Sequence, residues 1–166
     1  MDSYEGTEME IRFCEFQPYT GVVVNQQNFY TQNMDRDPDD PRYVKDVLHN
    51  QHSFETEKSP PRATTIFNIG LAEKGSTLDK KVILRKENQG SFVRLQCDQH
   101  EWEQAFFLPV RNPYYAVTGT NGRFTITHVP AGKHRILAWH PFAGKVEADV
   151  EVTAGATVTA NFQITK

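Results

Sequence analysis

The sequence predicts an all-β protein, a Greek-key β-sandwich, and three observations support this. Short segments that alternate apolar and polar residues recur along the last third of the chain, separated by turn residues every eight to twelve positions. Upstream segments are rich in Val, Ile, Phe and Thr, which favour strands. No segment sustains the 3.6-residue periodicity of an amphipathic helix. Many short strands with regular turn signals are typical of a sandwich.

The first two thirds of the chain predict strands at residues 64–69, 81–85 and 91–97. Residues 26–46 are crowded with Asn, Gln, Asp and two prolines, and we expect a long surface loop inserted between strands there. Apolar positions within residues 42–52 could form one or two helical turns. The Pro60-Pro61 pair marks a second break.

The C-terminal segment predicts four strands, at residues 123–127, 134–139, 146–152 and 157–164. Asn121-Gly122 precedes the first of them, and both residue types tolerate the positive φ of a tight hairpin turn. The change in pattern predicts two parts, residues 1–109 with the inserted loop 26–46 and residues 110–166, which could share one core.

Composition excludes several classes of protein. Lys and Arg number 18 against 21 Asp and Glu, so the net charge of −3 argues against nucleic acid as a partner. No apolar run is long enough for a transmembrane segment. The first twenty residues lack the basic end and apolar stretch of a secretory signal peptide. No nucleophile elbow occurs, so we expect no enzyme activity.

The clearest chemical feature is the pair Cys97 and His100, directly after a predicted strand. A thiolate and an imidazole separated by two residues could bind one metal ion from a single loop. About fifty residues upstream, His49 could supply a third ligand, which would complete a trigonal set of two histidines and one thiolate. We expect His52 to be a supporting or structural residue.

These motifs resemble those of the cupredoxins, and among them the amicyanin-like small blue copper proteins. The resemblance rests on His49-Asn50-Gln51-His52-Ser53-Phe54 and on Cys97-x-x-His100. The stretches Asn112–Thr118, Asn121–Ile126, Val129–Gly132 and Trp139–Pro141 resemble a carboxypeptidase-regulatory-like β module (transthyretin- or Ig-like), and Cys14–Pro18 occupies the place of an early strand. The resemblance therefore implies a cupredoxin-like sandwich that continues into this module.

The resemblance also implies a function. His49, Cys97 and His100 would be the equatorial ligands of copper, with Glu103 in the axial position, where the family has Met. A carboxylate is a harder donor that would favour Cu(II) and lower the reduction potential. The expected protein is an exported copper-binding electron-transfer protein of the periplasm or cell surface, whose partner is a redox protein such as a cytochrome.

Other interpretations of the same residues stay open. A Cys14–Cys97 disulfide would remove the thiolate, and the chain would then be a metal-free interaction or structural subunit of a larger extracytoplasmic assembly. Asp35-x-Asp37-x-Asp39 with Asp46 has partial calcium-loop spacing, although prolines interrupt it and a solvated acidic loop is favoured. Carbohydrate binding by aromatic residues of the C-terminal module is a weaker option.

Overall fold

The protein is described from a computed structural model, which covers residues 6–35, 46–58, 61–87 and 90–165. The chain divides into two compact units, Met1–Pro113 and Tyr114–Lys166. Each unit is described by itself below.

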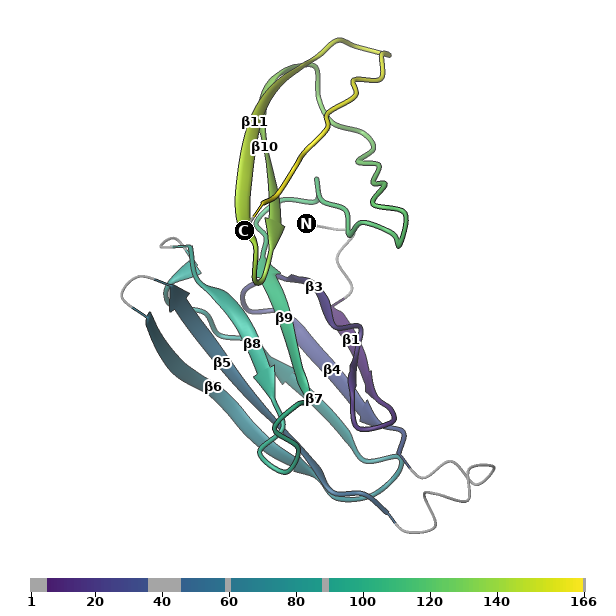
Figure 1. The fold of residues 1–166 in the computed structure, drawn as a ribbon, viewed down its shortest axis with the longest axis vertical. Helices are drawn as coiled ribbons and strands as arrows, with labels where there is room; N and C mark the ends of the chain where they lie inside the picture. Colours follow the sequence, from purple (N-terminus) through teal and green to yellow (C-terminus); the bar gives the residue numbers. More distant parts are fainter. Residues whose placement is uncertain (1–5, 36–45, 59–60, 88–89, 166) are drawn as a thin grey trace. The chain divides into compact units, whose positions relative to one another are not determined.

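The N-terminal unit is built from two β-sheets (Figure 1). The four-stranded sheet has the order β2 (Phe16–Gln17), β1 (Thr7–Ile11), β4 (Asn28–Asn33) and β7 (Thr77–Lys81). The five-stranded sheet has the order β3 (Thr20–Val23), β9 (Gln104–Pro109), β8 (Phe92–Gln96), β5 (His49–Lys58) and β6 (Pro61–Leu71). Two pairs, β1 with β4 and β3 with β9, are parallel, and the other pairs are antiparallel.

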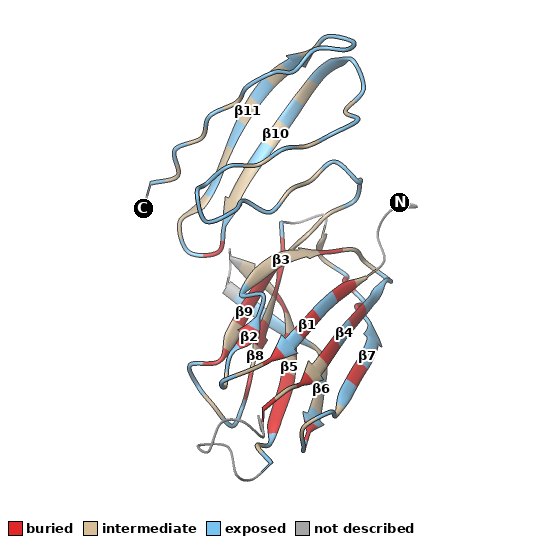
Figure 2. Cartoon of the chain, turned by 90° about the vertical axis from the view of Figure 1, so that its right-hand side faces the viewer, coloured by how far each residue is buried: buried red, intermediate tan, exposed pale blue. Residues whose placement is uncertain are grey.

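The core of this unit lies between the two sheets. Its buried cluster takes apolar side chains from both sheets, and buried positions alternate with exposed ones along β1 and β4 (Figure 2). Phe29 on β4 meets Phe107 on β9 edge to face, with ring centroids 5.2 Å apart. The prediction of an all-β sandwich is confirmed.

The inner face of β5 is polar. His49, Gln51, Ser53 and Glu55 are all buried, each two residues after the last, as the pleat of a strand requires. Glu55 illustrates how a buried polar side chain on this face finds hydrogen-bond partners. Its carboxylate accepts hydrogen bonds from the backbone N–H groups of Arg85 and Lys86 and from the Ser91 hydroxyl. This polar face brings His49 into the interior at the start of the strand.

Two expectations for residues 26–52 are wrong. The segment expected to be an inserted loop, 26–46, contains β4, whose buried positions are Phe29, Thr31 and Asn33. The strand was not predicted because some of its inward-facing residues are polar. Asn33, for example, can be buried because its side chain donates hydrogen bonds to the carbonyls of Val47 and Leu71. Helical turns within 42–52 are also contradicted from His49 onward, where β5 begins, while residues 42–45 lie outside the described part.

The C-terminal unit contains one antiparallel pair, β10 (Gly132–His140) and β11 (Gly144–Val152), as predicted for residues 134–139 and 146–152. The strands predicted at 123–127 and 157–164 do not form, although Phe124 and Ile126 are less exposed than the residues on either side of them. In the N-terminal unit, the segment predicted as a strand at 81–85 contributes only Lys81 to a strand, as the last residue of β7. Among the described residues, no helix has the length and apolar character needed to cross a bilayer.

Candidate metal centre

The loop between β8 and β9 brings three of the predicted ligands together. β8 ends at Gln96 and β9 begins at Gln104, so Cys97, His100 and Glu103 all belong to this connection. Two backbone hydrogen bonds close it: Cys97 N–H donates to the Glu103 carbonyl at 3.1 Å, and Glu103 N–H donates to the His100 carbonyl at 3.0 Å. The loop therefore curls back and directs its side chains to one point.

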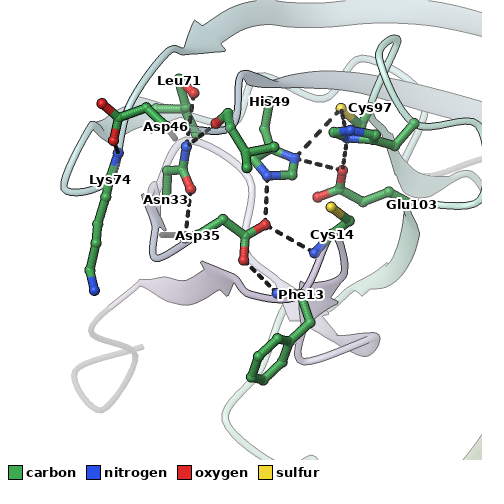
Figure 3. A network of polar contacts seen from close by, with 12 residues as sticks. Phe13, Cys14, Asn33, Asp35, Asp46, His49, Leu71, Lys74, Cys97 and Glu103 are labelled. Carbon is green, nitrogen blue, oxygen red and sulfur yellow. Dashed lines mark hydrogen bonds and ion pairs between the residues drawn. The ribbon is translucent and has the colours of Figure 1, made fainter. Parts of the chain in front are cut away.

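His49 approaches the same point from β5. Its side chain is fully buried, and its Nδ1 lies 2.9 Å from Glu103 Oε2 and 4.0 Å from Cys97 Sγ (Figure 3). His100 Nδ1 lies 3.3 Å from the same Glu103 oxygen and 3.6 Å from the sulfur. One atom from each of the four residues lies within 4.8 Å of the others. The structure thus brings together all four residues predicted from the sequence.

These separations suit a metal ion. Four ligands arranged tetrahedrally at metal bond lengths of about 2.0–2.3 Å are separated from one another by about 3.3–3.6 Å. The four separations given above run from 2.9 to 4.0 Å and bracket those values, and all the donor atoms lie within 4.8 Å of one another. Glu103 is 1% exposed, and its second oxygen, Oε1, is buried without a hydrogen-bond partner. A buried carboxylate oxygen with no donor is costly in free energy, and a cation would relieve that cost. The four residues therefore fit a metal.

The other side of the His49 ring meets a carboxylate that we did not expect. Asp35, two residues beyond β4, places Oδ2 2.7 Å from His49 Nε2 (Figure 3). Asp35 is 2% exposed, and its second oxygen accepts a hydrogen bond from the backbone N–H of Phe13. His49 is therefore held between two buried carboxylates, those of Asp35 and Glu103.

This arrangement sets the protonation of His49 in the metal-free protein. Burial alone would lower the pKa of His49, but hydrogen bonding to Asp35, Cys97 and Glu103 outweighs it and raises that pKa to about 11. Burial would likewise raise the pKa of Asp35, yet the hydrogen bonds from His49, Cys14 and Phe13 lower it overall. Without metal, His49 is an imidazolium with a carboxylate at each ring nitrogen.

Asn50 fastens the ligand loop to β5. Its backbone N–H lies 3.4 Å from Cys97 Sγ, and its side-chain oxygen accepts a hydrogen bond from Asp98 N–H at 2.7 Å. Its amide donates to Asp98 at 2.9 Å, and His52 contacts the same carboxylate at 3.1 Å. His52 therefore supports the loop through Asp98, consistent with the structural role expected for it.

Both cysteines are free. The sequence suggested that Cys14 lies on an early strand. It lies instead in the turn between β1 and β2. Burial, followed by the nearby Asp35 carboxylate, raises the pKa of its thiol. Of the acidic residues considered for calcium, Asp37 and Asp39 lie outside the described residues, and Asp35 hydrogen bonds to His49.

Comparisons with known proteins give the following similarities. The family described as polysaccharide lyase family 4, domain II, matches residues 87–160, which lie in both units of the chain. No curated protein matches. The carboxypeptidase-regulatory-like resemblance of the C-terminal segment stays a prediction.

Solved structures similar to the chain include three copper proteins. A purple cupredoxin from Nitrosopumilus maritimus is 12% identical, with a TM-score of 0.44, over 63% of this chain and 99% of that one. A copper-containing nitrite reductase from Thermus scotoductus is 10% identical, with a TM-score of 0.44, over 64% of this chain and 23% of that one. A reduced Cu(I) form of an amicyanin variant is 10% identical, with a TM-score of 0.42, over 65% of this chain and 85% of that one.

Proposed function

We propose that the N-terminal unit binds one copper ion through His49, Cys97, His100 and Glu103, and that it transfers electrons rather than catalysing a reaction. The observation that carries this proposal is the convergence of two imidazole nitrogens, one sulfur and one carboxylate oxygen within 4.8 Å. Two histidines with a cysteine are the donor set of copper electron-transfer sites. Copper would supply a one-electron couple, Cu(I) and Cu(II).

The surroundings of the four side chains suit electron transfer. Hydrogen bonds between backbone groups close the ligand loop, and Asn50 ties it to β5, so the donor atoms are held in place. A fixed donor set changes little between oxidation states, which favours fast electron exchange. The bound ion would be shielded from water, because Cys97 and Glu103 are buried.

His100 is the ligand nearest to solvent. Its side chain is 18% exposed, whereas the side chains of His49 and Glu103 are fully buried. The ring of Trp102, which is 69% exposed, lies 5.3 Å from the His100 ring. A redox protein such as a cytochrome would dock over this part of the loop and exchange the electron through His100. From the resemblance of its sequence motifs to those of the cupredoxins, we propose that the protein is located in the periplasm or at the cell surface.

Glu103 distinguishes this site from one with a thioether ligand. Its Oε2 lies 2.9 and 3.3 Å from the two imidazole nitrogens, closer than the Cys97 sulfur, which lies 4.0 and 3.6 Å from them. A carboxylate is a hard anionic donor and stabilises Cu(II) relative to Cu(I). We therefore expect a lower reduction potential than a Met ligand would give.

The test is copper loading of the purified protein, with elemental analysis and a visible spectrum. We expect one copper ion per chain and strong visible absorption from thiolate-to-copper charge transfer. Cys97→Ser should abolish the colour. Cys14→Ser is the matched control and should keep it, because Cys14 is outside the four-residue cluster. A colourless Cu(II) protein with a free Cys97 thiol would contradict the proposal.

The metal-free alternative depended in part on a Cys14–Cys97 disulfide. Both thiols are free, which removes that support. The remaining version, a scaffold within a larger assembly with a buried and unused Cys97, predicts two titratable thiols in the denatured chain and no bound copper. The copper measurement above therefore separates the two functions.

A further inference from the structure

The turn between β1 and β2 has an unfavourable conformation that a single carboxylate stabilises. Arg12 and Glu15 exchange two backbone hydrogen bonds, of 3.0 and 3.1 Å, around a loop of two residues. Both loop residues, Phe13 and Cys14, have positive φ, at 58° and 54°. Such turns strongly favour Asn-Gly, and positive φ is strained for a bulky residue such as Phe. Strain of this kind persists only where the surroundings enforce it.

Asp35 provides that enforcement. Its two oxygens accept hydrogen bonds from the backbone N–H groups of Phe13 and Cys14, at 2.5 and 3.0 Å. The oxygen that binds Cys14 also lies 2.7 Å from His49 Nε2. One buried carboxylate therefore joins the strained turn to the histidine whose other nitrogen faces Cys97 and Glu103 (Figure 3).

We propose that Asp35 is a positioning residue of the metal centre, and that it makes the site favour the oxidised, divalent ion. The inference rests on the proposed function. By accepting the Nε2–H of His49, Asp35 keeps the proton on that nitrogen and leaves Nδ1 to face the metal. Carboxylates that orient a metal-bound histidine in this way make the ligand more basic, and their loss typically reduces metal affinity by about 10–100-fold.

The negative charges around the site also favour Cu(II) over Cu(I). With metal bound, Cys97 as thiolate, Glu103 and Asp35 would place three negative charges around one ion, and all three residues are buried. Three negative charges exceed the charge of Cu(II) by one and that of Cu(I) by two. Buried charges are weakly screened, so each of these anions stabilises Cu(II) more than Cu(I). Asp35 is thus expected to lower the reduction potential without touching the metal.

The first test is Asp35→Asn in the copper-loaded full chain, which nearly conserves shape and removes the charge. We expect the ratio of Cu(II) to Cu(I) affinity to fall at least tenfold, which raises the reduction potential by at least about 59 mV. Glu55→Gln is the matched control. Glu55 is also a buried carboxylate that accepts two backbone N–H groups, but it is not among the clustered ligands. Its loss should lower stability and leave the potential unchanged.

Asp35→Asn will also destabilise the turn. A second parent protein, with a different turn sequence, therefore separates the effect of the substitution on stability from its effect on the reduction potential. Phe13→Asn with Cys14→Gly installs the Asn-Gly turn, which is favourable without the carboxylate. In that background Asp35→Asn should lower Tm less than in the natural turn and still raise the potential. An unchanged potential with intact copper absorption in this background would overturn the inference and leave the proposed function standing. If the unaltered protein shows no thiolate–copper absorption, the proposed function fails, and this inference fails with it.

Discussion

The number of protons released on metal binding tests the charge state of the centre. His49 has a pKa of about 11 in the metal-free protein, so at pH 7 its Nδ1 carries a proton that points at Glu103. A metal must displace that proton, and it must also displace the Cys97 thiol proton to bind the thiolate. We therefore expect two protons per metal ion. A histidine with an ordinary pKa near 6.5 would contribute only about a quarter of a proton at pH 7.

The assay is titration of the metal-free protein with Zn²⁺, which has no redox chemistry, in weakly buffered solution with a pH indicator. Release of two protons also means that the apparent affinity rises about 100-fold per pH unit near pH 7, or about 2.7 kcal/mol. Cys97→Ser, at saturating Zn²⁺, should release only the His49 proton. A release of close to one proton by the unaltered protein, with a tenfold change in affinity per pH unit, would refute the description of His49 as an imidazolium between two carboxylates.

Three further predictions follow from the same structure. In the metal-free protein the raised pKa of His49 contributes stability that is complete below about pH 6.5 and is lost as pH rises toward about 11; Tm should fall over that window, and the fall should be smaller in His49→Gln. Glu103→Met replaces a hard anion with a thioether, so a redox titration of the copper form should give a higher reduction potential. Phe107 is 0% exposed, and Phe107→Ala should reduce the free energy of unfolding in urea by about 3–5 kcal/mol; an unchanged urea midpoint would mean that this ring does not pack in the core.

The sequence was most informative where chemistry is local. Cys97, His100 and Glu103 are close in the chain, and the short connection between β8 and β9 brings their donor atoms together. His49 was added from a distant segment through the cupredoxin resemblance and the need for a third ligand, and the structure brings it to the same point. Their role as metal ligands stays a proposal that the copper measurements test.

Asp35 was missed because the residues that it contacts are distant from it in the sequence. It interacts with His49 on β5 and with the turn after β1, and no sequence spacing predicts either contact. One signal was available: buried residues on β4 are Phe29, Thr31 and Asn33, and Asp35 continues that alternation by one step. We instead assigned it to an acidic loop because polar neighbours surround it.

Strand β5 escaped prediction for a similar reason. β5 turns His49, Gln51, Ser53 and Glu55 inward, so its buried face has no apolar pattern to detect. These residues can be buried because tertiary hydrogen bonds satisfy them, as the backbone N–H groups after β7 do for Glu55. In the C-terminal unit the opposite error occurred. Alternation at residues 123–127 was present, but the segment has no strand partner in the described structure.

X-ray absorption at the copper edge of the loaded protein tests the central claim most directly, because it identifies the atoms bound to the metal. We expect one sulfur at about 2.2 Å and two imidazole nitrogens with one oxygen at about 2.0 Å, and the sulfur shell should vanish in Cys97→Ser but not in Cys14→Ser. A copper shell of nitrogen and oxygen alone, in protein whose Cys97 thiol is intact, would contradict the account.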